Sequence, residues 1–264
     1  FKNRRSVCTR KGICRMSIYV YGDSYAVSLQ ADWQWYKQYA KAKKEQCYVS
    51  ADFGVANEWT CMQIYKDFAD RKYQDGDTIF VVMTASTRHW FLWDHPNVSN
   101  YENMRDIPLE KFGITKDQVN AVEQYYRHIQ SGYIDSWKYD ATTTWLNHYA
   151  RRIKQDFNAN LIILQGFGNA TDVQPEGALW IQGNLFNTVC EGEFKSDKAM
   201  DEYYELPIPD QRINHMLKDN HTVLAQALLA NRPFDLAQLP WKKGILTVNT
   251  SAMLKDQMSP VPLR

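Results

Sequence analysis

The sequence has no apolar run long enough to cross a membrane and almost no excess charge of either sign. Its 31 Lys and Arg residues are nearly balanced by 30 Asp and Glu residues, giving a formal charge of +1 at pH 7. Neither nucleic acid nor a membrane is therefore an expected partner. Residues 1–15 are basic but lack the apolar stretch of a secretory signal. We expect them to be an N-terminal extension or leader, and we expect a cytoplasmic protein.

Paired cysteines and metal-binding spacings are also lacking. The five cysteines are odd in number, and no later Cys/His pair follows Cys8 and Cys14 to complete a zinc site. His89 and His95 have no further ligands at a suitable spacing. We therefore expect reduced, structural thiols, no metal and no other cofactor.

The chain has no Gly-rich phosphate loop, no internal repeat and no linker of Gly, Ser and Pro. The missing phosphate loop disfavours a nucleotide-binding protein, which is the third interpretation that we consider. The missing linker favours a single domain over residues 16–264, with a helical, aromatic-rich insertion at about 88–155. The 14% aromatic content fits either a carbohydrate-facing cleft or a large aromatic core.

Apolar runs alternate with helical patterns along the rest of the chain. Strands are predicted at 17–21, 47–51, 79–84 and 160–167. Helical spacing predicts helices over 25–44, 58–72, 117–134 and 142–157, and another beginning near residue 221. This βαβ series predicts an α/β fold with a parallel sheet and helices on both faces.

The turn after the first strand carries the first candidate catalytic residue. In "YGDSYA", Gly22 breaks the strand and Asp23 and Ser24 follow at its carboxyl end, where ligands bind in parallel sheets. Ser24 is either a nucleophile or the cap of the following helix. The nucleophile hypothesis requires a base, a group that orients the base, and donors for an oxyanion.

Two other segments contain residues suited to these roles. Asp210 and His215 lie in a loop before a helix, where the carboxylate can orient the imidazole as the base for Ser24. His221 competes as the base, but its place at the start of the helix favours a structural role. In "DFGVAN", the N–H of Gly54 can approach a ligand, and Asn57 either donates a hydrogen bond there or caps the next helix.

These segments resemble the blocks of the SGNH, or GDSL-type, hydrolase family of esterases and lipases. "YGDSYA" is similar to the first block with its nucleophilic Ser, and "DFGVAN" to the second block, whose Gly supplies an oxyanion N–H. The spacing from His215 to Leu224 and Ala225 matches the last block. The resemblance implies a three-layer α/β/α sandwich with a flavodoxin-like parallel sheet, and an oxyanion hole that includes the N–H groups of Ser24 and Gly54.

The chain departs from the family in two places. The last block usually has Asp three residues before the His, but that position is Arg212, and Asp210 lies five residues before His215. The third block, Gly-x-Asn-Asp, is replaced by "TASTR", with Thr84 and Ser86 at the Gly and Asn positions. Either hydroxyl can donate to an oxyanion.

Nearby residues are candidates for substrate binding. Arg88 either binds a substrate anion or pairs with an acid such as Asp23. Trp90, which directly follows a strand end, is expected to line the pocket, and Asn57 and Asp23 complete this candidate set. Asn169 is an alternative third-block donor, although a turn is the better interpretation of "GFGNATD".

The sequence thus predicts a serine esterase that hydrolyses carboxylic esters of short acyl groups through Ser24, His215 and Asp210. Its expected partner is a small-molecule ester substrate. The alternative is a catalytically weak, SGNH-like module that binds carbohydrate or has a structural role.

Overall fold

Five parallel strands form one sheet in the order β2-β1-β3-β4-β5. The computed structural model describes residues 16–27, 32–52, 54–86, 88–90, 115–128, 132–167, 176–185, 216 and 218–241. The strands are β1 (Ser17–Gly22), β2 (Gln46–Ala51), β3 (Thr78–Met83), β4 (Asn160–Gln165) and β5 (Ala178–Asn184). This strand order is that of flavodoxin-like, doubly wound sheets, so the predicted parallel α/β fold is confirmed.

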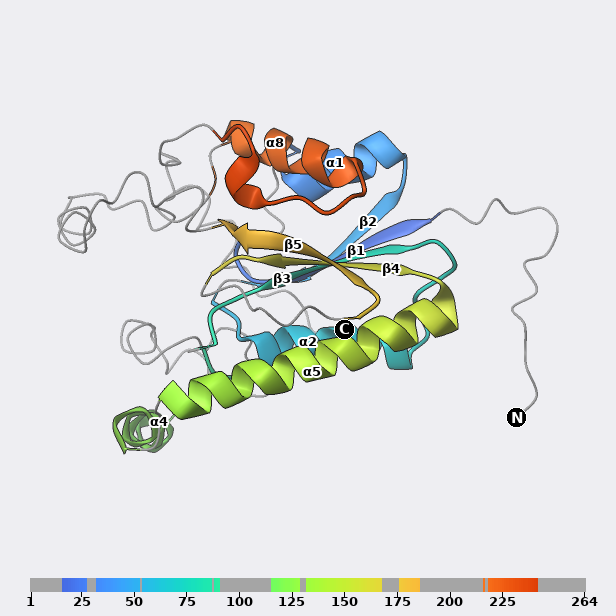
Figure 1. Ribbon diagram of the computed structural model, residues 1–264. Helices are drawn as coiled ribbons and strands as arrows, with labels where there is room; N and C mark the ends of the chain where they lie inside the picture. The colour runs from blue at the N-terminus through green and yellow to red at the C-terminus, as the bar shows by residue number, and fades with distance from the viewer. Residues whose placement is uncertain are drawn as a thin grey trace, which may run out of the picture.

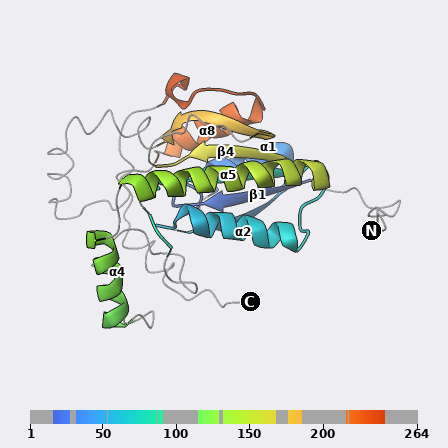
Figure 2. The ribbon, with the colours of Figure 1, turned by 60° about the horizontal axis from the view of Figure 1, so that its bottom comes forward.

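Helices cover both faces of the sheet and make three layers (Figure 1). Helices α1 (Trp35–Lys43) and α8 (Lys218–Leu229) pack on one face, and α2 (Asn57–Ala69) and α5 (Gly132–Phe157) on the other. Helix α4 (Lys116–His128) lies at the end of α5, away from the sheet in both views (Figures 1 and 2). The short 3-10 helix η2 (Leu236–Gln238) packs beside β5.

Alternating side chains of the central strands supply two separate apolar cores. Ile18 and Val20 of β1 join the core under α1 and α8, whereas Tyr19 and Tyr21 join the core over α2 and α5. Every residue of β3 is buried, as its uninterrupted apolar run predicts for a strand covered on both faces. Burial of each large apolar side chain stabilises the fold by about 1.5–3 kcal/mol.

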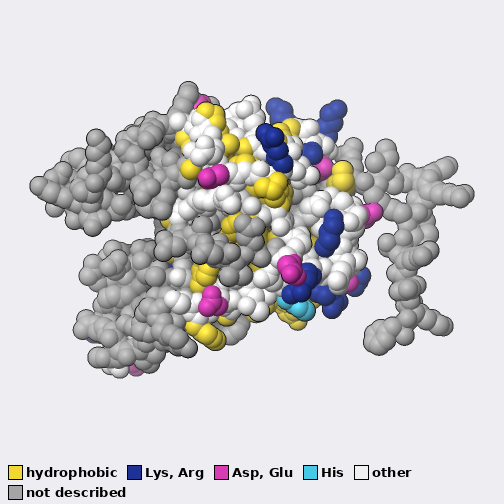
Figure 3. Space-filling model, viewed as in Figure 1, with side chains coloured by type: hydrophobic (Ala, Val, Ile, Leu, Met, Phe, Trp, Pro, Cys, Tyr) yellow, Lys and Arg dark blue, Asp and Glu magenta, His cyan; other side chains and the backbone are white. Residues whose placement is uncertain are grey.

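Helix α5 connects β3 to β4 across one face of the sheet. Its C-terminal half buries Leu146, Ala150 and Ile153 against the sheet, so part of the predicted helical insertion belongs to the three-layer core. On the face shown in Figure 3, basic side chains gather over this end of α5, where Arg152 and Lys154 are exposed. None of the helices within the described ranges combines the length and apolarity needed to span a membrane.

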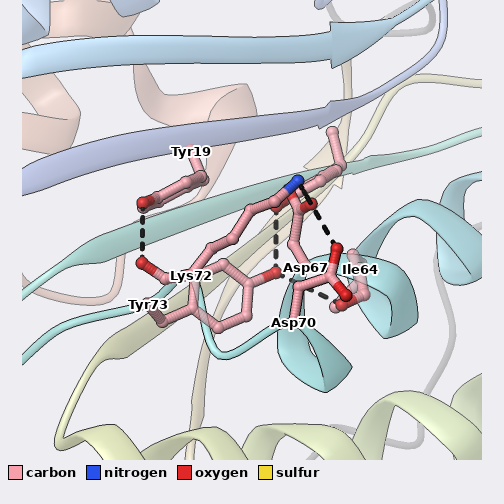
Figure 4. A network of polar contacts seen from close by, with 7 residues as sticks. Tyr19, Ile64, Asp67, Asp70, Lys72 and Tyr73 are labelled. Atoms are coloured by element: carbon pink, nitrogen blue, oxygen red, sulfur yellow. Dashed lines mark hydrogen bonds and ion pairs between the residues drawn. The ribbon is translucent and has the colours of Figure 1, made fainter. Parts of the chain in front are cut away.

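A network of tyrosine hydroxyls joins β1 to the end of α2 (Figure 4). Tyr21 donates to the Asp67 carboxylate at 2.6 Å and lies 2.9 Å from the Tyr73 hydroxyl. Lys72 pairs with Asp67, and its carbonyl accepts a hydrogen bond from Tyr19 at 3.1 Å. Burial raises the pKa of Tyr21 and Tyr73 far above the ordinary range. These hydroxyls therefore stay protonated, and the network has a structural role.

Three elements differ from the sequence predictions. Helix α5 begins at Gly132 and is therefore longer than the helix predicted over 142–157. Helix α1 begins at Trp35 rather than at residue 25, because a turn occupies the residues that follow Ser24. Strand β5 was not predicted. Its apolar residues end at Ile181, and Gly183 with a positive φ of 88° follows, so only pairing with β4 defines it as a strand.

Candidate active site

The candidate site lies at the carboxyl edge of the sheet, where β1 sits between β2 and β3. Gly22 ends β1 with a φ of 148°, and a Cβ on this residue would lie 2.5 Å from the carbonyl oxygen of Val82. Only glycine permits this close approach of β1 to β3. The chain connections reverse direction at this point, which is where ligands bind in doubly wound sheets.

Ser24 occupies a tight turn directly after β1. The Ala26 N–H donates to the Asp23 carbonyl at 2.8 Å, and the Tyr25 N–H donates to Asp23 Oδ1 at 3.1 Å. No helix begins in the described residues of this turn, so Ser24 does not cap a helix. The Ser24 residue is half-buried, whereas its neighbours on both sides are buried.

Asp23 and Arg88 form an ion pair inside this edge of the sheet. Asp23 Oδ2 lies 3.6 Å from Arg88 Nη1, and the Asp23 side chain has no exposed surface. Burial raises the pKa of Asp23 to about 6, against the opposing effects of Arg88 and the Tyr25 N–H. The Arg88 guanidinium also lies 4.7 Å from the centre of the Phe167 ring. Of the two predicted roles for Arg88, this geometry favours pairing with Asp23 over binding a substrate anion.

The loop after β2 lies beside this turn. The Asp52 N–H donates to the Gly22 carbonyl at 3.2 Å. Gly54 is half-buried and has a φ of 67°, a left-handed conformation that glycine adopts without strain. The predicted oxyanion donor therefore belongs to a loop that is tied to the end of β1.

Asn57, at the start of α2, hydrogen-bonds to Thr84, the residue that follows β3. Its Nδ2 donates to the Thr84 carbonyl at 2.9 Å, and its Oδ1 accepts from the Thr84 N–H at 2.8 Å. Ala56 is the N-cap of α2, with no side-chain cap hydrogen bond, so Asn57 is not the predicted helix cap. Because Asn57 is 3% exposed, these contacts favour a structural role over substrate binding.

The loop after β3 contains the remaining third-block candidates. Thr84 is 1% exposed, so its hydroxyl faces the interior and lowers the pKa of Asp23. Ser86 is half-buried and is the better placed of the two predicted side-chain donors. Trp90 is also half-buried, at the end of the described part of this loop.

Three side chains that sequence reasoning missed support this edge. Buried Gln165, at the end of β4, donates to the Thr84 carbonyl at 3.3 Å and also to the Phe167 carbonyl. Phe167 provides the ring beneath Arg88. Lys138 of α5 contacts the carbonyl groups of Ser86 and Arg88 in the loop after β3. Gln165 and Phe167 fall in the predicted strand over 160–167, and Phe167 also falls in "GFGNATD", but no sequence signal marked these two residues or Lys138 as part of the site.

The start of α8 is linked to the Ser24 turn through Trp35. The Trp35 indole N–H donates to the Tyr25 carbonyl at 3.0 Å, and its backbone N–H donates to His221 Nδ1 at 3.2 Å. Burial lowers the pKa of His221 to about 3, and a hydrogen bond with the Met216 backbone opposes this only in part. His221 is therefore neutral and structural, as its position in the sequence favoured.

The predicted base, His215, and its predicted partner, Asp210, lie outside the described residues, as does Asn169. Met216, which follows His215, is fully buried in the same core as Tyr25 and Trp35. The chain next to His215 thus enters the core that lies beneath the Ser24 turn.

The histidine, cysteine and acidic side chains of the described residues were compared with the arrangements that metal binding and thiol chemistry require. Among them, no group of three or more His, Cys, Asp and Glu side chains is arranged to hold a metal ion. Cys47 and Cys61 are free thiols. Burial raises the pKa of Cys47 to about 11 and that of Cys61 still further, so both thiols are protonated and unreactive.

Comparison with known proteins leaves the family of the chain open. No protein-family model matches it, and no curated protein matches it. Among solved structures, the chain is similar to the psychrotrophic esterase EstA from Pseudoalteromonas sp., studied in a form inhibited by monoethylphosphonate. The similarity covers 81% of this chain and 94% of the esterase, with 11% identity and a TM-score of 0.35. The fold class is therefore assigned from the strand order β2-β1-β3-β4-β5 and not from this similarity.

Proposed function

We propose that this protein is a serine hydrolase that cleaves carboxylic esters, with Ser24 as the nucleophile, His215 as the base and Asp210 as the group that orients His215. The observation that carries the proposal is the position of Ser24. It lies at the second position of a tight turn at the carboxyl end of β1, where doubly wound sheets bind their ligands. A helix-capping role, the main alternative for this serine, has no support because α1 begins at Trp35.

The link between α8 and the Ser24 turn supports His215 as the base. Trp35 bonds both to Tyr25, next to Ser24, and to His221 in the first turn of α8. Met216 is buried in the same core. His215 directly precedes Met216 in the sequence, and this neighbour in the core that contains Tyr25 is our reason for preferring His215 as the base. His221 does not compete for this role, because its Nδ1 already accepts the hydrogen bond from the Trp35 N–H and burial lowers its pKa to about 3, which makes it a weak base.

The proposed reaction has two halves. His215 accepts the Ser24 proton as Ser24 Oγ attacks the acyl carbonyl, and the N–H groups of Ser24 and Gly54 stabilise the oxyanion. The proton then passes from His215 to the leaving alcohol, which leaves an acyl group on Ser24. Water, deprotonated by His215, attacks this ester and releases the acid, and the proton returns to Ser24.

The third oxyanion donor is the weakest part of the proposed site. Both backbone groups of Thr84 bond to Asn57, and the Thr84 side chain is buried. Ser86 remains the side-chain donor that we propose. Since one oxyanion donor contributes about 10²–10³ in rate, a poorly placed Ser86 gives a slow enzyme rather than an inactive one.

The uncertain side-chain donor to the oxyanion also motivates the alternative function, a catalytically weak module that binds carbohydrate. Arg88 is directed inward to Asp23 and Phe167, and Asn57 is engaged by Thr84. If Ser86 does not donate, the donors that we propose among the described residues are reduced to the backbone N–H groups of Ser24 and Gly54.

Hydrolysis of p-nitrophenyl esters of increasing acyl length separates the two functions. We expect turnover that is highest for short acyl chains and that falls by at least about 10⁴-fold in Ser24→Ala, since the nucleophile is lost. Ser50→Ala, in β2 and outside the proposed machinery, serves as the matched control and should retain wild-type turnover. Turnover no higher than that of Ser24→Ala for every ester would refute the esterase proposal and favour the binding module.

A further inference from the structure

A buried lysine on α5, Lys138, makes polar contacts with three residues of the loop that follows β3. Lys138 Nζ lies 3.2 Å from the Ser86 carbonyl oxygen and 2.7 Å from that of Arg88. It also lies 3.0 Å from His89 Nδ1 and 2.7 Å from Glu58 Oε1 of α2. Lys138 is only 9% exposed. One ammonium group therefore joins three segments that are far apart in the sequence.

The chemistry of this cluster fixes the state of His89. A lysine ammonium has only donors, so His89 Nδ1 must accept and the imidazole must be neutral with its proton on Nε2. Burial and the neighbouring Lys138 together lower the pKa of His89 to about 4. Glu58 is the negative partner that balances the buried ammonium, as a buried charge requires.

The same loop is held a second time at its beginning. Asn57, adjacent to Glu58 in the first turn of α2, bonds to both backbone groups of Thr84. Helices α2 and α5 therefore hold the loop at Thr84 and again at Ser86, Arg88 and His89. Ser86 is the proposed donor, and the Arg88 guanidinium pairs with Asp23 immediately before Ser24.

We propose that Lys138 is a positioning residue of the active site, which holds the backbone carbonyls of Ser86 and Arg88 so that these two residues keep their places beside the Ser24 turn. This inference rests on the proposed function. The two carbonyl groups that Lys138 contacts belong to Ser86, the proposed oxyanion donor, and Arg88, the partner of Asp23. Both residues lie in the loop where the chain departs from the SGNH third block.

Lys138→Met tests the proposal, because it keeps the length of the side chain and removes the ammonium. We expect kcat for p-nitrophenyl acetate to fall by about 10- to 100-fold, as for a misplacement of reacting groups by about 1 Å, while KM changes less than about threefold. Lys154→Met is the matched control on the same helix. Lys154 is exposed, and its ammonium donates to Asn160 Oδ1 at 3.1 Å, far from the loop after β3 in the sequence, so loss of this ammonium should leave kcat unchanged.

A measurement that needs no activity accompanies the kinetics. In ¹⁵N spectra of the full chain, His89 should appear as the Nε2–H tautomer with a pKa near 4. In Lys138→Met its pKa should rise, but stay below 6.5, because burial is the larger cause of the shift. Amide hydrogen exchange at Arg88 and His89 should also become at least about tenfold faster as the loop opens more often.

The outcomes separate the two proposals. A fall in kcat at constant KM, with the His89 change, supports the positioning role. Unchanged kcat in a folded Lys138→Met refutes it. If the wild-type protein hydrolyses no ester, the esterase proposal fails. Independently of turnover, an unchanged His89 pKa and an unchanged amide exchange rate in Lys138→Met would refute the claim that Lys138 holds the loop.

Glu58→Gln is the second variant if Lys138→Met does not fold. It keeps an acceptor for Lys138 and removes only the charge. We expect the same changes in kcat and in the His89 spectrum at a smaller scale, less than about tenfold in kcat. The absence of both changes would contradict the proposal.

Discussion

Asn57→Ala distinguishes a structural role of this side chain from a role in binding substrate. The substitution removes two buried hydrogen bonds, from Asn57 Nδ2 to the Thr84 carbonyl and from the Thr84 N–H to Asn57 Oδ1. The Thr84 carbonyl keeps a second donor, Gln165 Nε2 at 3.3 Å. The Thr84 N–H, in contrast, is left without a partner in a region that water does not reach.

The size of the effect follows from these contacts. Each lost hydrogen bond lowers the free energy of unfolding by about 1 kcal/mol, and a buried donor without a partner costs about 1–3 kcal/mol. Because one of the two lost bonds includes that donor, we expect a total of about 2–4 kcal/mol. A protein of this size is stable by about 5–15 kcal/mol, so Asn57→Ala should still fold.

Urea unfolding followed by tryptophan fluorescence measures this change. Asn147→Ala is the matched control, because Asn147 Oδ1 accepts one exposed hydrogen bond from the Glu176 N–H, and its loss should lower stability by no more than about 1 kcal/mol. If Asn57→Ala instead retained wild-type stability and lost ester turnover, Asn57 would act on substrate and the structural interpretation would be wrong.

Three other substitutions test the candidate site. Gly22→Ala should lower the free energy of unfolding by about 2–6 kcal/mol, since its Cβ would lie 2.5 Å from the Val82 carbonyl oxygen; wild-type stability in urea would contradict this. The pKa of Asp23 is raised from 3.8 to about 6 in the folded protein, so its contribution to stability is present below about pH 4 and is lost as the pH rises through about 6. Unfolding measured from pH 4 to 7 should therefore show a decline that Asp23→Asn lacks, and parallel curves would refute it. His221→Phe should lower stability by about 1–3 kcal/mol, because the Trp35 N–H loses its acceptor; a shift in the acid limb of the pH–rate profile would instead make His221 a catalytic base.

The sequence predicted the central strands well because their signals are local. The chain is apolar without interruption from Ile79 to Met83 and from Leu161 to Leu164, which is what a strand buried on both faces requires. The start of α1 was not predicted correctly. "YAVSL" has helical spacing, but Asp23 bonds to the Tyr25 N–H and turns the chain before a helix can form.

The supporting shell of the site could not be predicted. Lys138 lies about fifty residues from the carbonyl groups that it holds, and a lysine within an amphipathic helix normally indicates a solvated face. The pairing of Arg88 was one of two open alternatives, and only burial beside Asp23 and Phe167 favours it. Such choices depend on tertiary packing, which leaves no periodic signal in the sequence.

Covalent labelling of Ser24 tests the central claim most directly. A fluorophosphonate reacts with a serine only where a base activates the hydroxyl and an oxyanion site accepts the phosphoryl oxygen. We predict one adduct by intact mass, mapped to Ser24, that is lost in Ser24→Ala and forms at least about 100-fold more slowly in His215→Ala. No adduct on Ser24 of the folded wild-type protein, or labelling of His215→Ala at the wild-type rate, would contradict the proposed esterase.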